Sequence, residues 1–358
     1  MKLGAFLMPA HPRYRSAAEG HFHDLDTLKF FDRIGLTEAW VGEHYMMPGE
    51  PCPSPDLLLA QAFLTTQRIL LAPGAFMLPF HHPAELAHRI CWLDHISGGR
   101  LMVGIGASGT TLDLEMFDID HRAGVHREMT AESIGMMLRF WESEAPFEVR
   151  GKYWTVRRPV DQLHRSSGYH LKPLQRPHPP IGVTGLSASS ETLRLAGRNG
   201  WLPISFCFTP AYLHTHWQVV EEGAQQVGRK PPSRADWRVS RPIFVGETDA
   251  EAWKLSVGGE MGRYFREDYL PMLAGNNALG LLKHHPDVAD SEVTVEYCAK
   301  RCWIVGSSET VRERIEEMQH LSGGFGVLHL MGFDHLDEME TTRNSYTELS
   351  RLVGAYFS

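Results

Sequence analysis

The chain has 358 residues, of which 43% are hydrophobic and 22% are charged, as in an ordinary soluble globular protein with one large core. Its 35 lysines and arginines against 43 aspartates and glutamates give a net charge of −8, and no basic cluster marks a nucleic-acid partner. No apolar run approaches the ~18 residues of a membrane span, and the N-terminal run is too short for the core of a signal peptide.

The cysteines are odd in number and scattered over the chain, which argues against a disulfide framework and favours a reducing compartment. They are Cys52, Cys91, Cys207, Cys298 and Cys302. We therefore expect a cytoplasmic protein.

Short apolar runs alternate with longer segments of helical periodicity along the first part of the chain. The expected elements are, in order, strand 3–8, helix 24–35, strand 38–42, helix 55–67, strand 69–77, helix 83–96, strand 101–105 and helix 124–142. Because parallel strands need helical crossovers, this alternation predicts a parallel sheet.

The second part of the chain is less regular. Residues 147–156 predict a hairpin around Gly151, within an excursion over about 145–180. The remaining expected elements are strand 181–184, helix 189–198, strand 202–206, helix 210–228, strand 239–245, helix 310–321, strand 327–331 and helix 337–356. Residues 255–300 have weak periodicity, and we expect them to form an insertion or lid.

Eight expected strands allow two α/β folds. A doubly wound sheet fits the periodicity alone almost as well, but about 350 residues with eight strand–helix units favour a closed (β/α)₈ TIM barrel with insertions. We expect a single such domain over residues 1–358.

Catalytic groups of a barrel project from the C-terminal ends of its strands. Four segments of unusual composition follow expected strands, namely 43–45, 78–83, 104–109 and 185–190. In the first, His44 titrates near neutrality, which suits it to proton transfer or to holding an anionic oxygen adduct. A structural histidine is the alternative interpretation.

Two of these segments have features of a ligand site. Gly104, Gly106 and Gly109 allow close approach to a ligand, and Ser108 adds a hydroxyl, but the spacing is neither a dinucleotide fingerprint nor a P-loop, and a plain turn remains the alternative. Residues 187–190 open a helix, where free N–H groups and serine hydroxyls suit a single phosphate, as in a mononucleotide such as FMN. Simple capping by one serine is the other interpretation.

A metal-dependent hydrolase is a rival prediction, because some hydrolase barrels hold zinc with an H-x-H pair on the first strand. His21 and His23 form such a pair, but they lie well past that strand, which disfavours a metal site. Cys298 and Cys302 lack a second ligand pair, and we interpret them as buried thiols. Of the adjacent His81 and His82, at most one is expected to face a cavity.

Six segments, taken together and in order, resemble the bacterial luciferase-like family of flavin monooxygenases. They are 40–44, 78–83, 93–100 with 104–106, 151–154, 177–181 and 187–189, and they span most of residues 1–205. Segments 40–44 and 322–326 are most similar to the limonene and diketocamphane monooxygenase branch.

The resemblance implies a two-component enzyme that takes reduced FMN from a separate flavin reductase. That flavin reacts with O₂, and the resulting flavin peroxide inserts one oxygen atom into a hydrophobic organic substrate by hydroxylation, epoxidation or Baeyer–Villiger insertion. His44 matches the family's active-site histidine. Gly74 and Ala75 match a non-proline cis peptide beneath the flavin ring, and Ser187 and Ser190 match the phosphate-binding corner.

We expect the remaining cofactor contacts to come from Gly106, Ala107, Ser108, Gly185 and Leu186. The family's luciferase members carry a reactive cysteine where Gly106 stands and a phosphate-contacting arginine where Ala107 stands, so neither group is used here. Light emission is therefore not expected.

Aromatic and polar residues near the expected strand ends are candidates for the substrate pocket, although a core position is the alternative for the apolar ones. They are Glu43, Tyr45, Phe80, His82 and Phe333. Insertion 255–300 would exclude water from the reaction.

Helices 55–67 and 83–96 match those that pair subunits in the family, and their apolar stripes favour a homodimer. Simple packing on the barrel explains the stripes as well. Two other functions remain open: a deazaflavin-dependent hydride-transfer oxidoreductase on the same barrel, and a non-catalytic flavin-binding relative or partner subunit.

Overall fold

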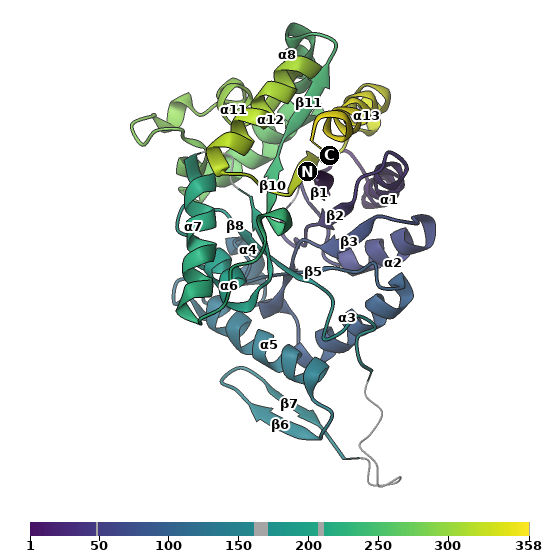
Figure 1. The fold of residues 1–358 in the computed structure, drawn as a ribbon, viewed down its shortest axis with the longest axis vertical. Helices are drawn as coiled ribbons and strands as arrows, with labels where there is room; N and C mark the ends of the chain where they lie inside the picture. The colour runs from purple at the N-terminus through teal and green to yellow at the C-terminus, as the bar shows by residue number, and fades with distance from the viewer. Residues whose placement is uncertain (48, 161–170, 207–210, 358) are drawn as a thin grey trace.

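The computed structural model describes residues 1–47, 49–160, 171–206 and 211–357 (Figure 1). Its main sheet is parallel, with the strand order β3-β2-β1-β13-β10-β9-β8-β5-β4. The strands are β1 (Lys2–Leu7), β2 (Glu38–Val41), β3 (Leu70–Pro73), β4 (Phe76–Met77), β5 (Val103–Gly106), β8 (Ile181–Gly185), β9 (Leu202–Ser205), β10 (Arg238–Arg241) and β13 (Val327–Gly332).

The sheet closes on itself at β3 and β4, which occupy a single strand position. β3 pairs with β2, β4 pairs with β5, and a bridge between Leu71 and Leu101 joins the two ends. The expected strand 69–77 is thus one barrel strand interrupted at residues 74 and 75. The eight strand positions of a (β/α)₈ barrel are confirmed.

Helices follow the strands and surround the barrel, as Figure 1 shows. They include α1 (Ala17–Arg33), α2 (Pro55–Thr65), α3 (Pro83–Ser97), α5 (Val125–Glu142), α6 (Glu191–Asn199), α7 (Ala211–Gln226), α12 (Ser308–Ser322) and α13 (Met339–Tyr356). The predicted start of the first helix at 24 is wrong, because Ser16 and Glu19 form a capping box that begins the helix at Ala17. Among the described residues, no helix is long and apolar enough to cross a membrane.

The expected strand 239–245 divides at Pro242, which has no N–H to continue the ladder. Beyond it, β11 (Ile243–Gly246) leaves the barrel and pairs in parallel with β12 (Ile304–Ser307), a strand that the sequence pattern did not predict. The chain between these two strands forms the insertion, and its helices include α8 (Asp249–Gly258), α9 (Glu260–Tyr264), a π-helical turn (Phe265–Tyr269), α10 (Leu270–Gly275) and α11 (Val295–Arg301).

A hairpin of β6 (Phe147–Arg150) and β7 (Thr155–Arg158) confirms the prediction for 147–156. Residues 161–170 of the longer excursion, residue 210 of an expected helix, and Cys207 lie outside the described residues. In Figure 1 the hairpin lies at the end of the molecule opposite β11 and α8.

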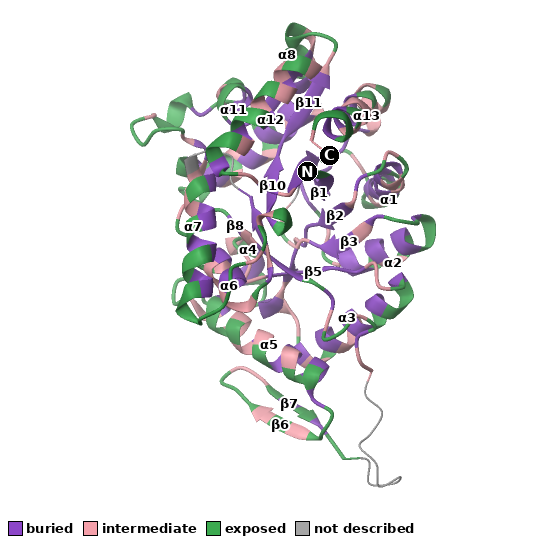
Figure 2. Cartoon of the chain, viewed as in Figure 1, coloured by how far each residue is buried: buried purple, intermediate pink, exposed green. Residues whose placement is uncertain are grey.

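The barrel strands are buried almost throughout, as the purple strands of Figure 2 show. A large apolar core lies between the strands and the surrounding helices, and a second joins the barrel interior to the insertion. The insertion is therefore attached to the barrel by apolar packing, close to the strand ends where catalytic groups are expected.

Candidate active site

His44 follows β2 and lies between two buried carboxylates. Its Nε2 is 3.5 Å from Oε2 of Glu50, and its Nδ1 is 3.5 Å from Oδ2 of Asp113. The Thr110 hydroxyl is 3.4 Å from the same Nδ1. The side chain of His44 is 18% exposed, whereas both carboxylates are fully buried. A histidine in this setting is accessible to a small ligand on one side only.

Asp113 ties the His44 loop to the segment after β5. It lies in the short helix α4 (Thr111–Met116), and its Oδ1 accepts backbone hydrogen bonds from Tyr45 at 3.2 Å and Met46 at 2.6 Å. The other oxygen of Asp113 is the one that faces His44. One carboxylate therefore both holds the loop and contacts the imidazole.

Glu50 connects His44 to the insertion. Its Oε1 accepts a hydrogen bond from the hydroxyl of Tyr264, which lies at the end of α9. Its Oε2 faces His44. The site is therefore assembled from the segments after the second and fourth barrel strands and from the insertion.

These neighbours change the proton affinity of His44. Burial by itself lowers the pKa of the imidazole, but the neighbouring carboxylate of Asp113 and the charges of Glu50 and Glu43 raise that pKa above its ordinary value. Burial also raises the pKa of Glu50. The geometry favours a positively charged His44, which can stabilise negative charge or donate a proton.

The carboxylate of Glu43 links the segment after β2 to β4 and to the residues that follow it. It accepts bonds from the Met77 backbone N–H at 2.9 Å, from the Tyr45 hydroxyl at 2.9 Å and from His81 Nε2 at 2.8 Å. The side chain is fully buried. Of the two adjacent histidines, His81 is thus the one that turns inward, while His82 is exposed at the start of α3.

Two of the aromatic residues expected in the substrate pocket lie together. The rings of Tyr45 and Phe80 are 5.5 Å apart, and Phe117 stacks on Phe80 at 4.4 Å and meets Tyr45 at 5.0 Å. Phe117 was not singled out in the sequence, because it falls in a segment without clear periodicity. Next to these residues in the sequence, Met46 and Met116 are exposed, so apolar side chains contribute to the surface around α4 beside the exposed Glu115 and Asp118.

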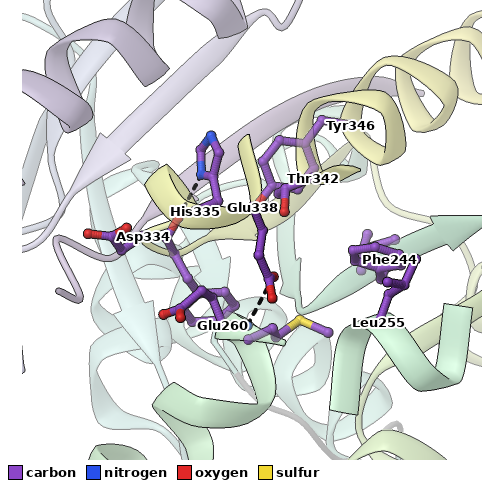
Figure 3. A pocket seen from close by; sticks show the side chains of 11 residues that line it. Phe244, Leu255, Glu260, Asp334, His335, Glu338, Thr342 and Tyr346 are labelled. Carbon is purple, nitrogen blue, oxygen red and sulfur yellow. Dashed lines mark hydrogen bonds between the residues drawn. The ribbon is translucent and has the colours of Figure 1, made fainter. Parts of the chain in front are cut away.

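Phe333 lies on the other side of the site, against the insertion, with its ring 5.0 Å from that of Tyr264. It also lines a cleft between β11, the insertion and the segment after β13 (Figure 3). The residues labelled there are Phe244, Leu255, Glu260, Asp334, His335, Glu338, Thr342 and Tyr346. This cleft is distinct from the candidate active site at His44.

The glycines near the expected flavin ring pack closely against neighbouring strands. The peptide bond between Gly74 and Ala75 is cis, as the resemblance implies. A Cβ at Gly74 would lie 2.9 Å from Trp40 Cβ, and one at Gly104 would lie 2.3 Å from the Pro73 carbonyl oxygen. At both positions the close packing of adjacent strands leaves no room for a side chain.

At Gly106 the contact is softer, since a Cβ there would lie 3.3 Å from the sulfur of Met77. Beyond it, Ala107 and Ser108 are half-buried, and the Ser108 hydroxyl accepts a bond from the Thr110 N–H at 3.2 Å. Ser108 has a positive φ of 66°, which turns the chain from β5 toward α4. The expected cofactor residues of this segment thus lie next to the His44 loop.

The expected phosphate corner lies at the start of α6. Ser190 is the N-cap of this helix, and its hydroxyl accepts a bond from the Leu193 N–H at 3.4 Å. Ser187 and Leu186 are exposed before it. The capping interpretation therefore holds for Ser190, while the Ser187 hydroxyl is directed to the surface at a helix N-terminus that suits an anion.

A buried hydrogen-bond chain fixes this corner from below. His216 Nε2 lies 2.8 Å from the Ser187 carbonyl oxygen, and its Nδ1 lies 2.9 Å from the Ser205 hydroxyl, which also accepts a bond from Trp237. Burial lowers the pKa of His216 to about 4, so the ring is neutral near pH 7 and donates from Nε2 to Ser187. A Cβ at Gly185 would lie 2.4 Å from Leu193, so the turn is tight.

The residues considered for metal binding lie apart from this site. His21 contacts Gln61 on the surface, whereas His23 is buried and faces His335 at 4.4 Å between ring centres. Within the described ranges, no group of three or more histidine, cysteine, aspartate or glutamate residues is arranged to hold a metal ion. Cys298 and Cys302 are free and buried.

Residues 1–323 match the model of the luciferase-like monooxygenases. The chain is 30% identical over 359 residues to 2,5-diketocamphane 1,2-monooxygenase 1 of Pseudomonas putida, covering 99% of this chain and 98% of that relative. It is 31% identical over 334 residues to limonene 1,2-monooxygenase of Rhodococcus erythropolis, covering 91% and 80%.

Among solved structures, the chain resembles the oxygenating constituent of 3,6-diketocamphane monooxygenase from P. putida, a type II Baeyer–Villiger monooxygenase in complex with FMN. The TM-score is 0.92 at 30% identity, and the match covers 100% of this chain and 99% of the other.

Proposed function

The chain belongs to the luciferase-like monooxygenases, and from this premise we propose that it is the oxygenating component of a two-component, FMN-dependent monooxygenase acting on a hydrophobic organic substrate. In the reaction, one atom of O₂ enters the substrate and the other leaves as water, with two electrons from reduced FMN. The observation that supports this most is the full-length likeness to an FMN-bound oxygenating constituent.

The residues at the strand ends fit FMN. Gly74 and Gly106 are partly exposed and carry no side chain, which favours the close approach of a flat ring. The exposed Ser187 and the N-terminus of α6 offer a hydroxyl and N–H groups to one phosphate. When bound, reduced FMN supplies the electrons that activate O₂.

His44 has the clearest chemical task in this arrangement. Its ring lies between Glu50 and Asp113, whose carboxylates favour its protonated form, and in that form it stabilises negative charge on a reacting oxygen and has a proton available for the water that leaves. Water must be kept from this reaction, and the insertion packed on the His44 loop contributes to that exclusion.

The substrate class follows from the side chains around α4. Tyr45, Phe80 and Phe117 form an aromatic cluster, and Met46 and Met116, next to it in the sequence, are exposed. Aromatic and methionine side chains near the site favour an apolar molecule over a charged one. Because the similar solved structure is described as a Baeyer–Villiger monooxygenase, cyclic ketones are the first class to test.

Two partners belong to this proposal. A separate flavin reductase supplies the reduced FMN. A second copy of the chain covers α2 and α3, whose outer faces expose Leu57, Leu64, Trp92 and Ile96. Four large apolar residues exposed on two helices that pack against each other favour an interface over a free surface.

Oxygen uptake tests the function. The protein is mixed with photoreduced FMN and then with O₂, in the presence of cyclic ketones, terpenes or aromatic compounds, and oxygenated product and hydrogen peroxide are measured separately. We expect product that carries ¹⁸O from ¹⁸O₂ with at least one class. If every class of compound gives hydrogen peroxide alone, and the protein transfers hydride to a deazaflavin, the chain is instead a deazaflavin-dependent oxidoreductase.

A further inference from the structure

We propose that Glu50, held in place by Tyr264 of the insertion, is a positioning residue that orients the His44 ring and keeps it positively charged. The packing of the insertion against the His44 loop thereby controls the orientation and the charge of the His44 ring. The proposal rests on the proposed function for its catalytic meaning, but the contacts that support it do not require a bound flavin.

Glu50 is a fully buried carboxylate with its two oxygens divided between two partners. Oε1 accepts the Tyr264 hydrogen bond, while Oε2 has no hydrogen-bond partner within the described residues and lies 3.5 Å from His44 Nε2. A buried charge without a partner is costly. The imidazolium of His44, 3.5 Å away, offsets this cost for the ionised carboxylate.

Packing fixes the position of the Tyr264 hydroxyl. The side chain is fully buried, and its ring lies 5.9 Å from that of Tyr269 and 5.0 Å from that of Phe333. One residue before Glu50, a Cβ at Gly49 would lie 2.7 Å from the Asp268 carboxyl carbon. The insertion therefore meets the His44 loop at two successive residues, and one of these contacts passes through Glu50.

Glu50 and Asp113 hold the imidazole from opposite nitrogens. A turn of the ring about its Cβ–Cγ bond would move both nitrogens away from these oxygens, so the pair favours the observed orientation of the ring. Three other charged groups shift these pKa values: Glu43 raises that of His44, Asp268 raises that of Glu50, and His11 lowers that of Glu50. The charge of Glu50 in turn raises the pKa of Tyr269. Of the two carboxylates that face His44, Glu50 is the one that accepts a hydrogen bond from the insertion, through Tyr264.

Histidine ring NMR on the full-length, flavin-free protein tests the proposal. The ¹⁵N resonances of His44 are identified by their loss in His44→Gln and followed as a function of pH. Relative to wild type, we expect the pKa of His44 to fall in Glu50→Gln and to fall by a smaller amount in Tyr264→Phe. Glu50→Asp, which keeps the charge, should restore part of the shift.

Tyr346→Phe is the matched control, because it removes another buried tyrosine hydroxyl, from a ring that packs on Phe31 and His335. It should leave the His44 titration unchanged. In the enzyme assay, the alkaline limb of the pH profile of product formation should move to lower pH in Glu50→Gln, with coupled turnover at neutral pH reduced on the order of tenfold.

An unchanged His44 titration in folded Glu50→Gln, or an equal shift in Tyr346→Phe, would overturn the proposal. Failure of the wild-type protein to bind FMN or to oxygenate any substrate would instead contradict the proposed function. The effect of Glu50 on the His44 titration would still be valid. FMN binding, measured by fluorescence quenching in each variant, keeps the two outcomes apart.

Discussion

Glu38 and His329 meet across the interior of the barrel, with Oε1 of the glutamate 2.7 Å from Nε2 of the histidine. They come from β2 and β13, on either side of β1, and Gly4 of β1 leaves room between them, because a Cβ there would lie within 3 Å of both side chains. Arg238 completes the cluster with two bonds to the same carboxylate, at 3.0 and 2.9 Å. This buried network lies at the start of β2, away from the strand ends that carry His44.

Substitution of Glu38 by Gln should therefore lower stability and leave the chemistry of the active site intact. Removing one partner of a buried ion pair leaves Arg238 unpaired, which costs roughly 3–5 kcal/mol. Thermal denaturation checks this, with Glu317→Gln on the exposed face of α12 as control. An equal melting temperature for Glu38→Gln and wild type would contradict the prediction.

The same pair predicts how stability depends on pH. Burial by itself raises the pKa of Glu38, but bonds and charges from His329 and Arg238 lower that pKa well below its ordinary value of 4.5. A lowered folded-state pKa means that the carboxylate stabilises the fold above pH 4.5 and that this contribution is lost as pH falls below it. The difference in melting temperature between wild type and Glu38→Gln should therefore shrink as the pH is lowered from 5 toward 3.

His44→Gln should uncouple the reaction. The substitution keeps the volume of the side chain but removes its charge between Glu50 and Asp113, so product formation should fall by roughly 10²–10⁴-fold while O₂ consumption continues as hydrogen peroxide. FMN affinity should stay near wild type, because the expected contacts to the ring and phosphate come from other segments. His320→Gln, on the exposed end of α12, serves as control. Full coupling in His44→Gln would contradict the role given to this residue.

Much of the fold follows from local patterns, and the candidate site follows only in part. Seven of the eight barrel strands are visible in the sequence as short, largely apolar and buried runs, whereas β10 (Arg-Val-Ser-Arg) was found only because the apolar β11 follows it. His44 is predictable because it directly follows such a run. Glu50, Asp113 and Tyr264 are not, because nothing local marks them and they meet only after the barrel closes and the insertion folds back.

The insertion, too, could be predicted from the sequence only in part. Its helices are short and broken by a π-helical turn, so periodicity over 255–300 is weak. β12 was missed because its partner, β11, lies far away in the sequence and outside the barrel. The sequence analysis placed the insertion between the seventh and eighth expected strands but predicted none of the elements within it.

Ser187 and Ser190 should separate into a binding role and a capping role. Ser190→Ala removes the hydroxyl that caps α6 and should cost ~1 kcal/mol of stability. Ser187→Ala should leave stability unchanged and weaken FMN binding, since its hydroxyl is exposed beside the helix N-terminus. Chemical denaturation and an FMN titration on both variants measure the two effects. Equal effects of both substitutions on both quantities would contradict this division.

His11 should stabilise the protein below alkaline pH. Burial by itself lowers the pKa of His11, but bonds to Asp334 at 2.7 Å and to Asp24 at 3.0 Å raise it to about 9. A raised folded-state pKa means that the contribution is complete below the unfolded value of 6.5 and is lost as pH rises through 9. The melting-temperature difference between wild type and His11→Gln should therefore be largest below pH 6.5 and decline up to pH 9.5. A difference that stays constant over this range would contradict the assignment.

The outer face of α2 and α3 should hold the dimer together. Leu64 is 84% exposed and Trp92 is 62% exposed, and they lie on helices that pack against each other. Burying such a face against a second copy is favourable at roughly 25 cal/mol per Å² of apolar surface, and two glutamates placed there would have to be desolvated. The double variant Leu64→Glu, Trp92→Glu should sediment as a monomer at concentrations where wild type is a dimer. Leu321→Glu, at a 52% exposed position of α12, should leave the dimer unchanged. A monomeric wild type would show that the chain does not form this dimer. A dimer that persists in the double variant would place the interface on another face.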